Sequence, residues 1–113
     1  MSDIPKKIRD IVSERSEGHC EVGLIAIGCT TRGEHKHHRK ISGREHLVEN
    51  LLDVCHICHE WIHRNPQLSR ASGWLVKMNY QPGDVTVIRQ GQEVHLLPDG
   101  GVSIVGQEEL FTT

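Results

Sequence analysis

His59 and His63 lie four residues apart in the segment HICHEWIHR, a spacing that suits metal binding. On a helix, side chains four residues apart lie one turn apart on the same face, so two imidazoles can hold one metal ion. His37 and His38 are adjacent, and adjacent side chains on a strand point to opposite faces. One of this pair can therefore bind the metal while the other acts as a base beside it.

Metal-assisted cleavage of a phosphodiester bond requires this division of labour. The metal ion neutralises charge on the scissile phosphate and stabilises the leaving oxygen, while a separate base deprotonates the attacking water. A histidine with a pKa of about 6.5 can be that base at neutral pH, provided that an asparagine or a backbone carbonyl orients its second nitrogen. A lone histidine is usually a surface or core residue, but an adjacent pair followed by Asn50 and by His-x3-His favours a site.

Three segments resemble the HNH endonuclease family, whose fold is the ββα-metal or His-Me finger fold. They are HHRK at residues 37–40, ENLL at 49–52 and CHICHEWIH at 55–63. The resemblance implies that His37 is the first metal ligand, that His38 is the general base, and that Asn50 tethers the loop between two strands and helps to fix the base. It also implies that His59 and His63 are the second and third ligands, the third being found in the colicin-type branch.

The wider chain is similar to small HNH proteins encoded by phages of actinobacteria, over residues 18–105. In those proteins a C-x(6–8)-C segment precedes HHR, and a Gly-Trp pair and a β-rich tail with a Gly-Gly turn follow, here at residues 73–74 and 100–101. The similarity implies a metal-dependent endonuclease that nicks or cuts duplex DNA with low sequence specificity. It also implies a role in phage DNA packaging, with the terminase as a partner.

Two kinds of metal ion are expected. The catalytic metal is Mg2+, Mn2+, Ni2+ or Zn2+, and three imidazole ligands favour transition metals in vitro, because imidazole suits Zn and Ni better than Mg. The pair Cys55-x-x-Cys58 can supply two thiolates to a structural zinc, and Cys20 and Cys29 can supply two more. Such a zinc would clamp the N-terminal segment onto the helix that carries the histidines.

The first cysteine pair departs from the two C-x-x-C pairs that many HNH proteins carry, since eight residues separate Cys20 from Cys29. Other arrangements of the cysteines therefore stay open. They are a Cys20–Cys29 disulfide, free thiols, or a mixed site that includes His19 or His56.

Positive charge gathers around the paired histidines, although the chain as a whole has a net charge of −2. Between residues 32 and 44, five lysines and arginines face a single acidic residue, Glu34. Such a stretch can bind phosphates, and those contacts would weaken as salt rises, although a solvated loop face is the alternative. The candidate phosphate contacts are Lys36, Arg39, Lys40 and Arg64.

The length of 113 residues suits one domain, and the low aromatic content of 4% predicts a modest core of the kind that a metal often reinforces. The start MSDIPKKIRD has no apolar run typical of a secretory signal, and no segment approaches the roughly 20 apolar residues that span a membrane. The expected location is the cytoplasm, with no membrane partner. Disulfides are disfavoured there, which argues against a secreted, disulfide-stapled domain.

The predicted elements place the histidines on a hairpin and a helix. A helix over 3–17, with Asp3 as cap, Pro5 in the first turn and Gly18 as its stop, presents an apolar face. Strands over 35–40 and 51–54 precede a helix over 56–64. A second short helix, with Asn65 as cap and Pro66 in its first turn, ends at Gly73.

The remainder is predicted to be a β-meander with strands at 75–78, 85–89, 93–97 and 102–105, and a loosely held end. The fold class is therefore α+β: a ββα-metal core with an N-terminal helix, a four-cysteine zinc site and a small C-terminal β-meander. The chain is expected to be a single domain, comprising the N-terminal helix (1–18), the zinc-braced core (19–64), and the short helix with the β-rich tail (65–113).

A non-catalytic zinc module that binds DNA or protein is the competing hypothesis. It would explain the four cysteines, but it would not explain a histidine base at position 38 beside three candidate ligands. DNA is the expected partner in the leading hypothesis, and metal-dependent nicking separates the two.

Overall fold

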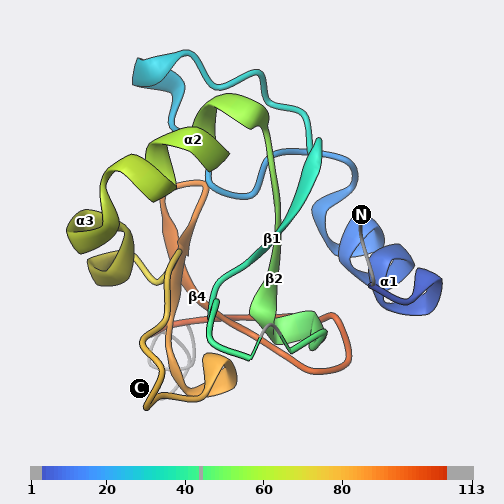
Figure 1. The fold of residues 1–113 in the computed structure, drawn as a ribbon. Helices are drawn as coiled ribbons and strands as arrows, with labels where there is room; N and C mark the ends of the chain where they lie inside the picture. The colour runs from blue at the N-terminus through green and yellow to red at the C-terminus, as the bar shows by residue number, and fades with distance from the viewer. Residues whose placement is uncertain (1–3, 44, 107–113) are drawn as a thin grey trace, which may run out of the picture.

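The computed structural model describes residues 4–43 and 45–106. Within them it is a small α+β fold of three α-helices and two antiparallel sheets, one of two strands (β1-β2) and one of three (β3-β4-β5). The hairpin β1-β2 lies at the centre, with α1 on one side and α2 on the other (Figure 1). The longest described helix, α1, has 11 residues, and none of the described helices could cross a membrane.

Helix α1 (Lys6–Ser16) packs its apolar face against the hairpin, as its periodicity predicts. Ile8, Ile11 and the buried Val12 form a small core with Val48 and Leu51. The helix starts later than expected, and Pro5, predicted in its first turn, instead precedes its first residue with an extended backbone (ψ 143°). The predicted cap Asp3 lies outside the described residues. It ends where Glu17 and Gly18 both adopt positive φ angles, 55° and 77°.

Strand β1 (His35–His38) pairs antiparallel with β2 (Leu51–Val54), in a register that sets His37 opposite Leu52. All four residues of β2 are buried, because its two faces pack against different neighbours: Leu51 contacts the α1 core, whereas Leu52 and Val54 belong to the larger core. β1 is shorter than the predicted 35–40. At Lys40 the backbone N–H pairs with the Asn50 side chain instead of a strand.

Helix α2 (His56–Arg64) follows β2 after Cys55, whose sulfur caps it by accepting a hydrogen bond from the backbone N–H of Cys58. Helix α3 (Pro66–Ala71) begins with Pro66, as expected. Asn65 occupies the N-cap position of α3, as predicted, but its side chain makes no capping hydrogen bond to that helix. Its side-chain amide instead donates to the carbonyl of Trp61 at 2.9 Å, so it closes the end of α2.

The C-terminal sheet is a meander of β3 (Val87–Arg89), β4 (Gln92–Leu96) and β5 (Val102–Ile104). Val87, Val94 and Leu96 pack in the same core as β2 and α2. The predicted strand at 75–78 does not form; this segment makes a backbone hydrogen bond from Val76 to the carbonyl of Arg39 and joins neither sheet. The expected loose end, after residue 106, lies outside the described residues.

A buried ion network joins α1 to both sheets. The carboxylate of Glu21, which is fully buried, accepts hydrogen bonds from Arg15 of α1 and from Arg89 of β3, each at 2.8 Å. It also accepts the backbone N–H of Asp53 in β2. Burial alone would raise the pKa of Glu21, but the hydrogen bonds and charge of Arg15, followed by the hydrogen bond from Arg89, outweigh burial and lower it. The network therefore holds an ionised carboxylate beneath the hairpin.

Candidate functional site

Three imidazoles converge at the surface of the hairpin. One ring nitrogen from each of His37, His59 and His63 lies within 4.8 Å of the other two. His59 and His63 come from successive turns of α2 and His37 from β1, and their ring centroids are 5.0 to 5.3 Å apart. The structure therefore brings together the three histidines selected as metal ligands. Neutral imidazoles are the donors that suit Zn2+, Ni2+ and other transition metals.

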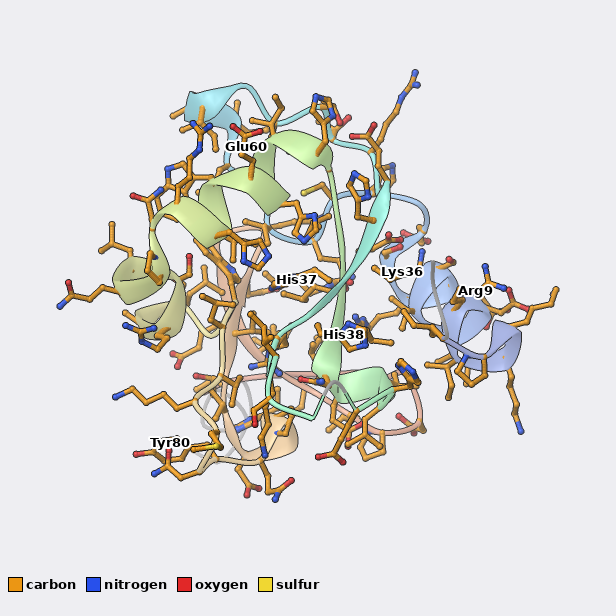
Figure 2. The ribbon with its side chains drawn as sticks, in the orientation of Figure 1. Arg9, Lys36, His37, His38, Glu60 and Tyr80 are labelled. Atoms are coloured by element: carbon orange, nitrogen blue, oxygen red, sulfur yellow. The ribbon has the colours of Figure 1, made fainter. Side chains whose placement is uncertain are left out.

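A cleft of about 310 Å³ opens over these imidazoles. Figure 2 shows Lys36, His37 and His38 following one another along β1 at this surface. The cleft is lined by Lys36, His37, His38, Ile41, His59 and His63. Among the described residues β1 pairs with a strand on one side only, so side chains from both of its faces reach the cleft along its other edge.

His37 is oriented by a main-chain atom. Its Nε2–H donates a 2.8 Å hydrogen bond to the carbonyl of Trp74, which leaves the lone pair on Nδ1, the nitrogen that can bind a metal. The ring is 2% exposed, and this burial, with the nearby His59 and His63, lowers its pKa to about 3. His37 is therefore neutral at pH 7, as a metal ligand must be. Sequence reasoning could not find the Trp74 carbonyl, because a main-chain atom has no side-chain signature.

His59 is also biased toward its neutral form. Partial burial, followed by the charges of His63 and His35, lowers its pKa. The His35 ring lies 5.3 Å from that of His59 and was not selected from the sequence. Strand alternation could have found it, because residues 35 and 37 share one face of β1.

His38, selected as the base, is the last residue of β1, and Asn50, selected as the orienting residue, directly precedes β2. Nε2 of His38 is 3.1 Å from Nδ1 of His46, another histidine that sequence reasoning passed over. Asn50 is fully buried and holds the loop between the strands. Its Oδ1 accepts the N–H of Lys40 at 2.7 Å, and its Nδ2 donates to the carbonyl of Glu45 at 2.9 Å. These bonds tie the loop backbone at Lys40 and at Glu45 to one side chain.

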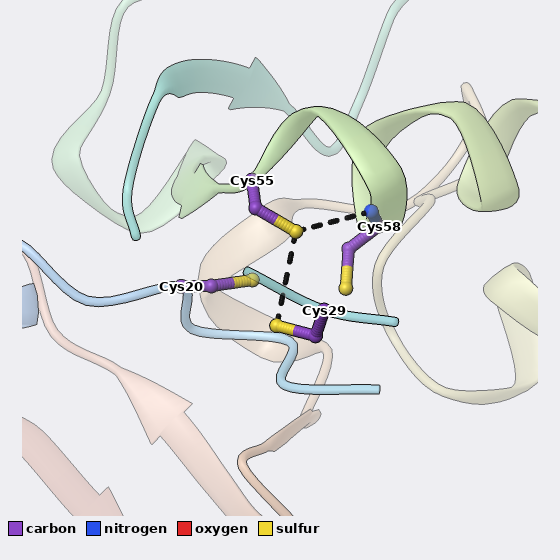
Figure 3. A group of neighbouring side chains, drawn as sticks. All are labelled: Cys20, Cys29, Cys55 and Cys58. Carbon is purple, nitrogen blue, oxygen red and sulfur yellow. Dashed lines mark hydrogen bonds between the residues drawn. The ribbon is translucent and has the colours of Figure 1, made fainter. Parts of the chain in front are cut away.

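The four cysteines form a second cluster at the start of α2. Their sulfurs all lie within 4.8 Å of one another and point toward a common centre (Figure 3). The sulfurs of Cys29 and Cys55 are 3.7 Å apart, close to the separation of about 3.8 Å between thiolates around a tetrahedral zinc with Zn–S bonds of about 2.3 Å. All four are free thiols, so the disulfide alternative does not form. This cluster could bind a metal such as zinc.

The pKa values of these thiols differ. Burial raises the pKa of Cys20 and Cys58, a cost that a bound cation would offset. Burial alone would also raise that of Cys55, but hydrogen bonds to its sulfur, the first from the Cys58 backbone, lower it to about 6. The histidines weighed for a mixed site are outside the cluster; His56 instead contacts Glu34 at 3.0 Å.

Arg39 was expected to contact phosphate, but the structure contradicts this expectation because the residue is completely buried. Its guanidinium donates to four backbone carbonyls, those of Gly73, Glu49, Pro82 and Val85, at 2.7 to 3.1 Å. Burial lowers its pKa to about 10, so the group stays charged at pH 7. Arg39 therefore joins three segments that are distant in the sequence, and its guanidinium is not available to a ligand.

The other three basic residues predicted to contact phosphate differ in their exposure and in their ion pairs. Lys40 is only 8% exposed, so the structure also argues against this expected contact. Lys36 lines the cleft and forms a 3.1 Å ion pair with the buried Asp53. Arg64 is exposed on α2, paired with Glu60 at 2.8 Å.

Helix α2 and its cap residue carry two members of each cluster. Cys55 and Cys58 lie at the start of α2, and His59 and His63 come after them along it. The chain therefore combines a thiol cluster suited to a structural metal with an imidazole cluster that faces an open cleft. Comparison with protein-family models, curated proteins and solved structures found no match to this chain.

Proposed function

We propose that this protein is a metal-dependent endonuclease of the HNH type, which hydrolyses phosphodiester bonds of duplex DNA with low sequence specificity. The observation that carries the proposal is the convergence of His37, His59 and His63 within 4.8 Å beside His38 in one cleft. The order strand, strand, helix in β1, β2 and α2 agrees with a ββα-metal core. The role in phage DNA packaging, with a terminase partner, rests on the family resemblance alone.

The proposed chemistry divides the work between two faces of β1. A divalent metal held by the three imidazoles would neutralise charge on the scissile phosphate and stabilise the leaving oxygen. His38 takes a proton from the attacking water, whose oxygen forms a new bond to phosphorus as the bond to the leaving oxygen breaks. Lys36 lines the cleft with its ammonium paired to Asp53, and it is the cation that would contribute positive charge toward the phosphate. Trp74 keeps His37 in the tautomer that binds metal.

Plasmid nicking with added Mg2+, Mn2+ or Ni2+ tests this function. We expect the wild type to nick supercoiled DNA and chelation to stop it. His38→Ala should lower the rate by about 10²- to 10⁴-fold, the usual contribution of a general base, while metal binding measured by calorimetry is retained. His37→Ala should lose both metal binding and cutting. His95→Ala, in β4, is the matched control and should cut like wild type.

Two results would contradict the proposal. Equal cutting by wild type and His38→Ala would remove the base from the mechanism. A wild type that binds metal at the histidines but cuts no DNA under any of these conditions would favour the non-catalytic zinc module, which the four-cysteine cluster also fits.

A further inference from the structure

We propose that His46 is a positioning residue for His38: a hydrogen bond between the two imidazoles fixes the orientation and tautomer of the base. The inference rests on the proposed function, since it assigns a role within that reaction. It starts from the 3.1 Å distance between Nε2 of His38 and Nδ1 of His46. The two ring centroids are 5.2 Å apart and the rings are inclined by 47°, so they meet through these nitrogens and not face to face.

The chemistry of a base selects the direction of this hydrogen bond. Between two neutral imidazoles, one nitrogen must donate and the other accept. If His46 donated, the lone pair on Nε2 of His38 would be engaged and its Nδ1 would carry the proton, so His38 could not accept a proton from water. If His38 donates from Nε2, its lone pair lies on Nδ1. Only the second arrangement gives a competent base, and in it His46 is the acceptor.

The backbone around His46 is held on both sides by Asn50. Nδ2 of Asn50 donates to the carbonyl of Glu45, directly before His46, at 2.9 Å. The backbone N–H of Asn50 donates to the carbonyl of Leu47, directly after it, also at 2.9 Å. Asn50 itself is fully buried, which fixes the donor side of both bonds. Asn50 therefore fixes His46, and His46 in turn fixes His38.

This relation gives Asn50 a route to the base. The side-chain hydrogen bonds of Asn50 reach the loop backbone at Lys40 and Glu45, and its own N–H reaches Leu47. Its effect on the side chain of the base passes through His46, whose ring spans from the tethered loop to β1, while its bonds at Arg39 and Lys40 hold the backbone beside the base. A loop histidine thus performs the orienting task that an asparagine side chain or a carbonyl was expected to perform.

Two substitutions of His46 separate a positioning role from a packing role. His46→Asn keeps a hydrogen-bond acceptor, Oδ1, as many bonds from the backbone as Nδ1, whereas His46→Leu fills similar space without an acceptor. We expect His46→Leu to lower kcat about 10- to 100-fold, as loss of an orienting partner does elsewhere, with KM for DNA and metal affinity unchanged. His46→Asn should recover kcat to within about fivefold of wild type, since the acceptor is restored. His95→Leu is the control and should match wild type.

Nitrogen-15 NMR of His38 supplies a readout that does not depend on cutting. We expect the Nε2–H tautomer in wild type and in His46→Asn, and a mixture of tautomers in His46→Leu. Unchanged His38 signals in His46→Leu, or an unchanged kcat in His46→Leu when the wild type cuts DNA, would overturn the role of His46 and leave the proposed function standing. A wild type that cuts no DNA would overturn both, so the two failures are distinguishable.

Discussion

The imidazole of His37 and the backbone of Trp74 are joined by a 2.8 Å hydrogen bond from Nε2–H to the main-chain carbonyl. The two residues are 37 positions apart, so the metal-binding form of His37 depends on where the chain runs after α3. That course is set by Gly73, which has a φ of +77°. A β-carbon at this position would overlap the carbonyl oxygen of Thr86.

Gly73→Ala should therefore weaken metal binding at the histidines although it touches none of them. The overlap with Thr86 must displace the Gly73–Trp74 backbone, and loss of an outer partner to a ligand lowers metal affinity about 10- to 100-fold. Calorimetric titration with Zn2+ or Ni2+ measures this. Gly91→Ala is the control, because Gly91 has a φ of +84° but open space around it. Gly91→Ala should lose about 1–2 kcal/mol of stability and keep the wild-type affinity for metal. A wild-type metal affinity in Gly73→Ala would contradict the prediction.

Arg39→Met should destabilise the fold strongly. It leaves four backbone carbonyls without their donor, and each unsatisfied buried group costs about 1–3 kcal/mol. We expect the free energy of unfolding, measured in urea, to fall by about 3 kcal/mol or more. Arg64→Met, at a residue whose side chain is 75% exposed, should change it by less than about 1 kcal/mol. If Arg39→Met were as stable as the wild type but bound DNA more weakly, this prediction would be contradicted and Arg39 would be a phosphate contact after all.

Glu21→Gln should destabilise the protein at neutral pH because it removes the charge between Arg15 and Arg89. Breaking a buried ion pair costs about 3–5 kcal/mol, whereas Glu60→Gln, in an exposed pair, should cost at most about 1 kcal/mol. The folded-state pKa of Glu21 is lowered, so its contribution is present above the ordinary value of 4.5 and is lost as pH falls toward the folded-state pKa. The stability difference between wild type and Glu21→Gln should therefore narrow below pH 4.5. A difference that stays constant with pH would contradict this explanation.

Cys29→Ser should remove the structural metal. Cys29 is the one cysteine of the cluster that is only partly buried, so its loss disturbs packing least. The apparent binding free energy of a structural zinc is about 10–16 kcal/mol. The melting temperature should therefore fall by more than about 10 °C, and elemental analysis should find about one zinc fewer per chain. In excess chelator the two proteins should melt together; a separation that persists there would mean that the cysteine acts through packing.

Helix α2 and strand β2 could be predicted from the sequence to the residue, because a short, mostly apolar run (LLDV) is followed by a helical repeat that ends before Pro66. The members of the imidazole and thiol clusters that lie on α2 or cap it could be predicted as well, since they depend on spacing along one short segment. Within a single helix or strand, the spacing of residues along the sequence is enough to fix the relative positions of their side chains.

The features that could not be predicted depend on contacts between distant segments. Arg39 was expected at the surface because arginine is almost never fully buried, and its burial requires carbonyls from segments up to 46 residues away. The segment after Gly73 has the composition of a strand, but near the hairpin its backbone pairs with the Arg39 carbonyl and not with a strand. The positions of Trp74 and His46 depend equally on chain paths that no local pattern specifies.

Because Cys58 and His59 are neighbours on α2, the helix fixes the direction in which the thiols of one cluster point relative to the imidazoles of the other. Each residue added to an α-helix turns the rest of the helix by about 100°. One residue inserted between Cys58 and His59 would leave the thiols in place and swing both imidazoles out of the cleft, away from His37. To graft this site onto another scaffold, residues 55–63 must therefore be transferred as one uninterrupted segment. A change in the number of residues between the two clusters would separate the ligands of at least one of them.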